Sequence, residues 1–198
     1  MGVLTSKKLR IDQYLDYERQ GEVRYEFHLG EVFAMAGGTL AHTILSSNAL
    51  RLLGNALQQA GKNCLAVNSD IKIEIESSKR YVYPDAAVIC GKINESDVIT
   101  GAIRNPRIVV EVVSDTSGDY DRGAKMRYYL SLPTLKEYLI IEQDRVHATL
   151  YRKHEKGDLG SFHYSDGLDA SIDLNSIGVS IKMTDLYQNV PIANEGEL

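Results

Sequence analysis

Tryptophan is absent from this sequence of 198 residues, and cysteine occurs only twice, as Cys64 and Cys90. The lack of tryptophan argues against a sugar cleft with stacked indole rings, so we rank a glycosidase with an acid/base carboxylate pair low. Each cysteine lies in an apolar, strand-like stretch. We expect two buried free thiols, and a single disulfide stays open as the alternative.

A surplus of basic residues is also missing, because 22 lysines and arginines stand against 27 aspartates and glutamates, for a net charge of −5. This balance argues against tight, sequence-independent DNA binding by the whole surface, although a local basic cleft remains open. The glycine-rich fingerprints of phosphate loops and dinucleotide sites are absent as well, so use of NTP or NAD is not indicated.

Long apolar runs are missing too. No stretch approaches the length of a membrane span, and residues 1–10 lack the apolar segment of a signal peptide. We therefore expect a cytoplasmic protein. What is present is an ordinary globular composition, 43% hydrophobic and 25% charged, over a length that predicts a single domain spanning residues 1–198.

The first part of the chain predicts a short helix, a hairpin and a long helix. Thr5 or Ser6 can cap a helix that ends near Gly21. Residues 25–35 contain two strand-like runs around a glycine turn, a pattern typical of a hairpin. Thr39 then precedes the longest helical pattern, and we expect it to cap a helix over residues 40–60.

The middle of the chain predicts three strands, a helix and a further strand. Their expected ranges are 71–75, 81–90, 108–113, 121–132 for the helix, and 138–141. A strand, a helix and a strand in this order are typical of a crossover between parallel strands. With further strands near 146–151 and 161–164 and a short helix near 183–187, the chain predicts a mixed α/β domain: a central mixed sheet flanked by helices, with an N-terminal hairpin and extra C-terminal strands.

Two acidic residues occupy positions where burial is expected. Asp85 follows Pro84 at the end of an apolar run, and Glu111 lies inside the apolar strand 108–113. A buried carboxylate destabilises a protein unless it is paired or binds a cation. Because two such acids fall on neighbouring strands and Lys125 falls on the next helix, we predict a site for a hard divalent metal.

Mg²⁺ or Mn²⁺ suits oxygen ligands of this kind, with water or substrate phosphate completing the shell. Such an ion can activate a water for attack on a phosphodiester. The ammonium of Lys125 could orient that water or offset charge in the transition state. Asp121 lies four residues before Lys125 and could join the site, or it could simply cap the helix and pair with Lys125.

Two further residues are accessory candidates. His42 falls in the first turn of the long helix, where a lone histidine is ordinarily structural or on the surface. Asp70 stands between an apolar run and the alternating strand, where it either makes a turn or lines the cleft.

The string Pro84-Asp85, a spacer and Glu111-Val112-Val113 resembles the signature of restriction-endonuclease-like nucleases, which is Pro-Asp, a spacer and then Asp or Glu, any residue and Lys. Val113 stands where that lysine would be. In some branches of the superfamily the following helix supplies the lysine, and Lys125 fits this position.

The longer order of motifs, over about residues 9–190, resembles the Uma-type (Uma-two) family of proposed restriction endonucleases, found mostly in cyanobacteria and other bacteria. The matching pieces are Tyr25-Glu26, Gly30-Glu31, His42, Ser69-Asp70, Tyr83-Pro84-Asp85, Glu111 to Ser114, Asp121, Lys125, Tyr129 and Leu135 to Tyr138. The resemblance implies a mixed sheet flanked by helices, a divalent metal and DNA cleavage.

Carried over by position, the resemblance makes Asp85 and Glu111 metal ligands and Lys125 the catalytic lysine. Glu26 would be the extra acid that completes such sites, although that acid commonly comes from the first core helix and Glu26 precedes it. Glu31 is a second candidate of the same kind. The alternative for both is an ordinary exposed strand glutamate.

These patterns, together with the family resemblance, predict a magnesium-dependent endonuclease that hydrolyses DNA. Clusters of lysine and arginine at residues 7–10, 79–80 and 122–127 could face DNA together in a homodimer, which would suit a nuclease that cuts both strands. The alternative is a binding module that keeps the nuclease fold without catalysis. It gains support only if Lys125 points away from the two carboxylates.

Overall fold

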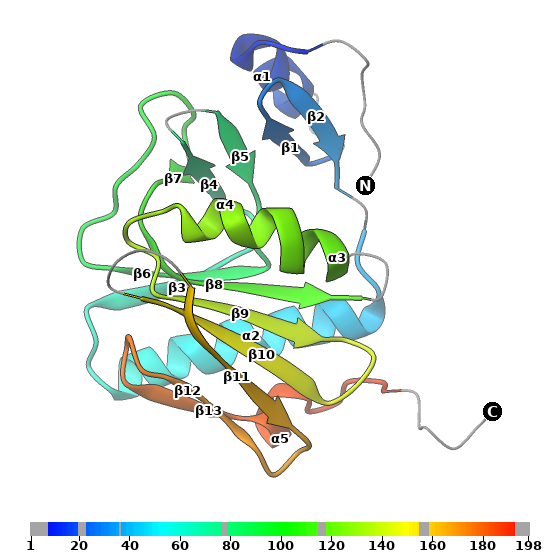
Figure 1. Cartoon of the computed structure of the whole chain (residues 1–198), viewed down its shortest axis with the longest axis vertical. Coiled ribbons are helices and arrows are strands. Elements are labelled where there is room, and N and C mark those ends of the chain that lie inside the picture. The colour runs from blue at the N-terminus through cyan, green and yellow to red at the C-terminus, as the bar shows by residue number, and fades with distance from the viewer. Residues whose placement is uncertain are drawn as a thin grey trace, which may run out of the picture.

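Six strands form the central sheet of the computed structural model, which describes residues 8–19, 23–35, 37–76, 79–114, 118–154 and 159–192. In the order β11-β10-β9-β8-β6-β3, their bounds are Leu159–Asp166, His147–Lys153, Glu137–Glu142, Pro106–Val113, Ala86–Cys90 and Cys64–Asn68 (Figure 1). β8 and β9 are parallel, and the other neighbouring pairs are antiparallel. The predicted mixed sheet and its crossover are therefore confirmed.

One face of this sheet is covered by the long helix α2 (Leu40–Gln59). Thr39 caps it as predicted, because its Oγ1 accepts a hydrogen bond of 3.1 Å from the backbone N–H of His42. The small sheet β12 (Ser171–Leu174) and β13 (Val179–Lys182) and the short helix α5 (Met183–Leu186) share that side. Together they enclose the largest apolar cluster of the protein.

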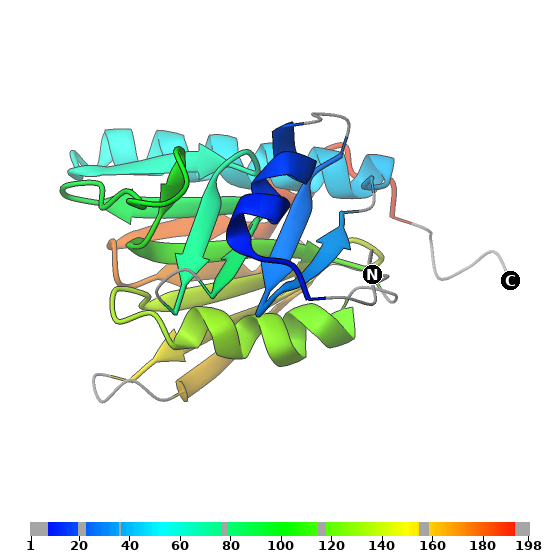
Figure 2. The same cartoon turned by 90° about the horizontal axis from the view of Figure 1, so that it is seen from above.

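The opposite face carries a helix in three parts: α3 (Gly118–Tyr120), the π-helical segment η1 (Asp121–Lys125) and α4 (Met126–Leu130). Figure 2 shows α2 and α4 on opposite sides of the central sheet. This helix forms the crossover between β8 and β9. It starts three residues before the predicted 121–132 helix and ends two residues earlier, and Pro133 follows its last turn.

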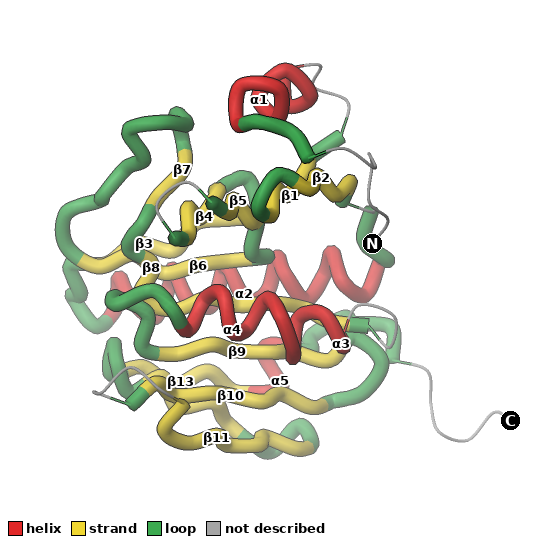
Figure 3. Tube along the Cα trace, turned by 45° about the horizontal axis from the view of Figure 1, so that its top comes forward, coloured by secondary structure: helices red, strands yellow, loops and turns green. Residues whose placement is uncertain are grey.

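A second sheet packs beside α4, in the order β2-β1-β5-β4-β7. Its strands are β1 (Tyr25–His28), β2 (Glu31–Ala34), β4 (Lys72–Ile75), β5 (Arg80–Val82) and β7 (Ala102–Ile103). Its outer side packs against α1 (Ile11–Arg19), which lies beyond the hairpin in Figure 3. The predicted hairpin is confirmed. The predicted caps of the first helix, Thr5 and Ser6, lie outside the described residues.

Strand β8 shows why Glu111 is buried. Ile108, Val110 and Val112 belong to the apolar cluster under α2, and Val109 and Val113 belong to the cluster under α4. Side chains alternate between the two faces of a strand, so Glu111 lies on the α4 face between two valines. Only 3% of Glu111 is exposed.

The predicted continuous strand 81–90 is wrong. The chain forms β5, bends at Tyr83-Pro84-Asp85 and continues as β6 in the other sheet. Proline has no N–H to donate to a strand ladder, and this favours a break at Pro84. Asp85 therefore lies in the bend that joins the two sheets, where its backbone N–H donates to Val110 O at 3.1 Å.

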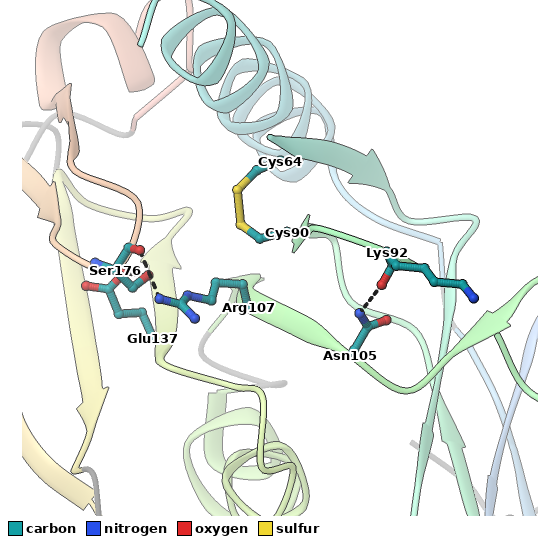
Figure 4. Close-up of a disulfide and its surroundings, with 7 residues drawn as sticks. All are labelled: Cys64, Cys90, Lys92, Asn105, Arg107, Glu137 and Ser176. Atoms are coloured by element: carbon teal, nitrogen blue, oxygen red, sulfur yellow. Dashed lines mark hydrogen bonds between the residues drawn. A yellow bond between two sulfur atoms is a disulfide. The ribbon is translucent and has the colours of Figure 1, made fainter. Parts of the chain in front are cut away.

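The expectation of two free thiols is also wrong, because Cys64 and Cys90 form a disulfide (Figure 4). The two cysteines are directly opposite each other in the antiparallel pair β3–β6, with their Cα atoms 4.0 Å apart. The sequence alone did not reveal which residue of β3 lies opposite Cys90. The bond ties the edge strand β3 to the sheet at the end of β6 remote from Asp85.

Strands β3, β7, β12 and β13 fall outside the predicted ranges. Within the described ranges, no helix combines the length and the apolar character needed to cross a membrane.

Candidate active site

The π-helical segment η1 places two charged side chains inside the protein. Asp121 and Lys125 begin and end this segment, and only 7% and 4% of them are exposed. Single π-helical turns interrupt α-helices frequently at functional sites. Here the segment lies over the β8–β9 face of the sheet, so the side chain of Lys125 reaches the strand that carries Glu111.

Lys125 is the centre of a buried charge cluster. Its Nζ lies 2.9 Å from Glu111 Oε1, 3.5 Å from Glu26 Oε1 and 3.5 Å from Asp121 Oδ1. It also donates a hydrogen bond of 3.0 Å to the backbone carbonyl of Tyr83. An ammonium has three protons to donate, so these partners occupy its full capacity. Lys125 therefore points toward the carboxylates and away from solvent.

Glu26 joins the same cluster from the hairpin strand β1 and is fully buried. Its Oε1 accepts from the backbone N–H of Tyr83 at 3.2 Å, and its Oε2 accepts from the hydroxyl of Tyr120 at 3.0 Å. His28 Nε2 lies 3.1 Å from the same Oε2. The hairpin, the bend before Asp85 and the crossover helix thus meet at one carboxylate.

Asp85 contacts His42 and the backbone of β8, and no direct contact links it to Lys125 among the interactions of the described residues. Its Oδ2 accepts a hydrogen bond of 2.7 Å from the backbone N–H of Val112, and its Oδ1 lies 3.1 Å from His42 Nε2. Both side chains line a cleft of about 830 Å³ between α2 and the loops at the ends of the strands. Asp85 and Glu18 are thus acids that line the cleft, whereas Glu26, Glu111 and Lys125 are not among its lining residues.

The pKa shifts follow from burial and crowding of like charge. Burial raises the pKa of Glu111 well above its ordinary value, and the ammonium of Lys125 only partly opposes this. Burial likewise raises the pKa of Asp121. For Glu26, burial favours the neutral form, but Lys125, His28 and a backbone donor outweigh it and lower the pKa to about 2.

The two basic groups of the region both favour their charged forms. Burial acts to lower the pKa of Lys125, but the surrounding carboxylates, Glu111 foremost, raise it well above its ordinary value. The hydrogen bond to Asp85 raises the pKa of His42. Both groups therefore favour the protonated, positively charged form.

Three tyrosines, Tyr120, Tyr129 and Tyr138, complete the cluster. Tyr129 and Tyr138 are among the residues that match the family, but the sequence assigned no role in the site to any of the three. Tyr129 donates from its hydroxyl to Glu111 Oε1 at 3.0 Å, and Tyr138 donates to the backbone carbonyl of Asp121 at 3.0 Å. Tyr129 lies one helical turn after Lys125, and that spacing could have identified it. No local signal pointed to Tyr120.

Two predicted candidates lie outside the cluster. Glu31 is exposed at the end of the hairpin turn. Asp70 is exposed in the turn before β4, where it pairs with Arg24 at 3.1 Å. Asp70 is thus at the rim of the cleft, next to the lining residue Ser69.

Carboxylate oxygens are the donors that Mg²⁺ and Mn²⁺ prefer, so the chemistry of Asp85 and Glu111 fits a hard cation. Across the described part of the chain, no three His, Cys, Asp or Glu side chains converge in the arrangement of a metal site. A magnesium site commonly uses only one or two carboxylates and keeps several waters, so two protein ligands suffice.

Comparison with known proteins adds a family match. A family model described as "Uma2: Putative restriction endonuclease" matches residues 11–184. Two proteins of Synechocystis sp. (strain ATCC 27184 / PCC 6803 / Kazusa), named "Uncharacterized protein slr1290" and "Uncharacterized protein sll1609", are each 33% identical to this chain. The first alignment covers 92% of this chain and 93% of that protein, and the second covers 77% and 85%.

A solved structure has the same fold. It is described as a putative nuclease belonging to DUF820 from Anabaena variabilis ATCC 29413. The TM-score is 0.69 at 15% sequence identity, over 87% of this chain and 96% of that one. This likeness confirms the predicted fold class.

Proposed function

The chain belongs to the Uma2 family, described as "Putative restriction endonuclease", and from this premise we propose that it is a metal-dependent endonuclease that hydrolyses DNA phosphodiester bonds. The proposal rests on one observation: three carboxylates, those of Glu26, Glu111 and Asp121, surround a single buried ammonium. Buried negative charge in excess of its counter-charge is unfavourable. The raised pKa values of Glu111 and Asp121 are one response to this crowding, and a divalent cation held at Glu111 would be another.

Asp85 and Glu111 would hold the ion. Asp85 meets the cleft from the bend between the sheets, and its carboxylate is held by Val112 N–H and His42. Glu111 projects from the neighbouring strand and is held by Tyr129 and Lys125. A divalent ion supplies a water of lowered pKa and offsets negative charge on a phosphate.

The chain's own groups then orient the reaction. Lys125 keeps its proton at neutral pH, so its ammonium holds Glu111 and places positive charge behind the reacting phosphate. Glu26 stays ionised and anchors Lys125 together with the carbonyl of Tyr83. His42 positions Asp85 through its ring nitrogen.

The substrate we propose is DNA bound along the cleft that Asp85 and His42 line. With a net charge of −5, the surface as a whole does not attract DNA, so local contacts must. Arg24 at the cleft is one such cation, close to Ser69 and Asp70. We further propose a single functional domain, a homodimer and a cytoplasmic location, each of which stays a prediction.

The experiment is a cleavage assay on plasmid and oligonucleotide DNA with Mg²⁺ or Mn²⁺, and with EDTA as the control. The variants Asp85→Asn, Glu111→Gln and Lys125→Met keep side-chain size and remove charge, and Lys92→Met removes an exposed lysine as the matched control. We expect cleavage by the wild type and the control, and loss of cleavage in the three site variants.

Circular dichroism of each variant separates loss of catalysis from loss of fold. No cleavage by the folded wild type under either metal, together with no metal binding by calorimetry, overturns the proposal and favours the binding module. Cleavage that survives Asp85→Asn and Glu111→Gln places the chemistry elsewhere.

A further inference from the structure

Strand β11 is an open edge of the central sheet. It pairs with β10 on one side, and within the described residues no strand pairs with its other side. The backbone N–H and C=O groups on that outer side form a template for another strand. An edge of eight residues is long enough to matter, because natural proteins usually shorten or blunt such edges.

One usual protection of an edge is present in β11: its register shifts at Gly160, opposite Arg152 and Lys153 of β10, which leaves residues 161–166 as the regular stretch. The other protections are missing from β11. Its sequence contains no lysine, arginine or proline, and its only charged residue, Asp166, lies at the end of the strand. The carboxylate of Asp166 pairs there with His147 at 2.5 Å. Nothing along the strand therefore repels a second strand.

The α4 side of β11 carries an exposed aromatic pair. Phe162 is 53% exposed and Tyr164 is 60% exposed, and their ring centroids lie 5.2 Å apart. Phe162 also packs near Tyr151 on β10, at 6.3 Å between centroids. In Figure 1, β9 and β10 lie between α4 and β11, and both rings are more than half exposed.

We propose that this edge binds a second copy of the chain, with two β11 strands paired antiparallel across a two-fold axis at His163. In this register Phe162 of each copy faces Tyr164 of the other, and Ser161 faces Ser165. Residues directly opposite in an antiparallel pair share a face, so all four rings meet on one side of a joined sheet.

Other registers of the two β11 strands bury less aromatic surface. An axis at Phe162 leaves Tyr164 opposite Gly160, and an axis at Tyr164 places Phe162 opposite the charged Asp166. An axis between two residues puts the aromatic pairs of the two copies on opposite faces of the sheet. The axis at His163 is the arrangement that covers both rings of both copies and brings no like charges together.

The interface is small. An aromatic side chain has roughly 200 Å² of surface to bury, and about half of that is exposed for Phe162 and Tyr164. Four such rings and the two strand backbones therefore bury less than the ~1,200 Å² of a stable complex. We therefore expect a reversible dimer that dissociates on dilution. This dimer would supply the interface of the homodimer in the proposed function. Because the dimer is detected by its mass and the nuclease by DNA cleavage, a failure of one proposal can be distinguished from a failure of the other.

Sedimentation velocity on the full chain tests the dimer. The wild type has a mass of 22.0 kDa as a monomer. Its weight-average mass should rise toward twice that value between about 1 μM and about 200 μM, the range that a weak interface requires. Phe162→Lys should keep the monomer mass throughout, whereas Val98→Lys, at a comparably exposed apolar residue in the loop between β6 and β7, should behave as the wild type.

Cysteine cross-linking tests the register independently of stability. Under mild oxidation, His163→Cys should form a covalent dimer across the axis. Ser161→Cys and Ser165→Cys should each form no covalent dimer alone and should cross-link to each other when mixed. A wild type that stays monomeric at every concentration, a dimer that survives Phe162→Lys, or the absence of the His163→Cys cross-link overturns the proposal.

Discussion

Replacement of Lys125 by methionine tests whether one ammonium holds the buried acids together. Methionine has a similar length and volume, so the change removes the charge and leaves little cavity. The variant keeps Glu111, Glu26 and Asp121 within a few ångströms of a position that no longer carries positive charge. Because only 4% of Lys125 is exposed, water screens this loss poorly.

The expected loss is large. Removal of one partner of a buried ion pair destabilises a protein by about 3–5 kcal/mol, since the other charge is left buried without compensation. For a chain of this size, each kcal/mol lowers Tm by about 2–4 °C, so we expect a fall of about 6–20 °C. The surface variant Lys92→Met should stay within about 0.5 kcal/mol of the wild type.

A second change identifies the source of the loss. Glu111→Gln removes the acid closest to Lys125, at 2.9 Å, so the double variant Lys125→Met/Glu111→Gln should be more stable than the sum of the single changes predicts. Coupling between contacting groups is about 0.5–3 kcal/mol. Urea denaturation of the four proteins in EDTA measures this coupling directly.

The pH dependence has a definite sign. Burial raises the pKa of Glu111 and Asp121 in the folded protein above their ordinary values of 4.5 and 3.8. The stability that these groups contribute is therefore fully present below the ordinary pKa values, and it is lost as pH rises through the raised pKa values of the folded protein. Without Lys125 the free energy of unfolding should depend more steeply on pH. The Lys125→Met variant should therefore regain part of its lost stability when the pH is lowered from 7.5 to 5. A Lys125→Met protein as stable as the wild type, or additive single changes, would refute the reasoning.

Three further outcomes are expected. Thr39→Ala removes the cap of α2 and its hydroxyl bond to Gln143 at 2.7 Å, and should lower the free energy of unfolding by about 1 kcal/mol in urea; no change would contradict the cap. The pKa of Glu26 is lowered from 4.5 to about 2, so its contribution of ~3 kcal/mol is present above pH 4.5 and is lost as pH falls toward 2; acid titration of Glu26→Gln should lack this part of the transition, and an unchanged acid transition would contradict it. Mg²⁺ at about ten times its Kd should stabilise the wild type by about 1.4 kcal/mol in thermal melts and leave Asp85→Asn/Glu111→Gln unaffected; equal stabilisation of both would contradict the two ligands.

The sequence by itself determined the elements with strong local signals. Apolar residues at helical spacing after Thr39 predicted α2 and its cap, and a glycine turn between two short runs predicted the hairpin. The strand, helix and strand order predicted the parallel pair β8–β9. These signals are local, because period, caps and turns depend on residues close together in the chain.

Elements with weak or ambiguous signals were missed. The run before Cys90 looked like one strand, and only the packing of two sheets shows that it bends at Pro84. The disulfide depends on the register of β3 against β6, which no residue of either strand encodes alone. β12 and β13 have short alternating patterns of four residues each, too short to distinguish from a loop.

The site divides in the same way. An acid inside an apolar strand and an acid after a proline are visible in the sequence, and both Glu111 and Asp85 were predicted from them. Only the tertiary structure brings Glu26 from the hairpin and Tyr120 from the crossover helix to Lys125. Burial of like charges around one ammonium arises from the meeting of segments far apart in the chain, and contacts of that kind have no local signal.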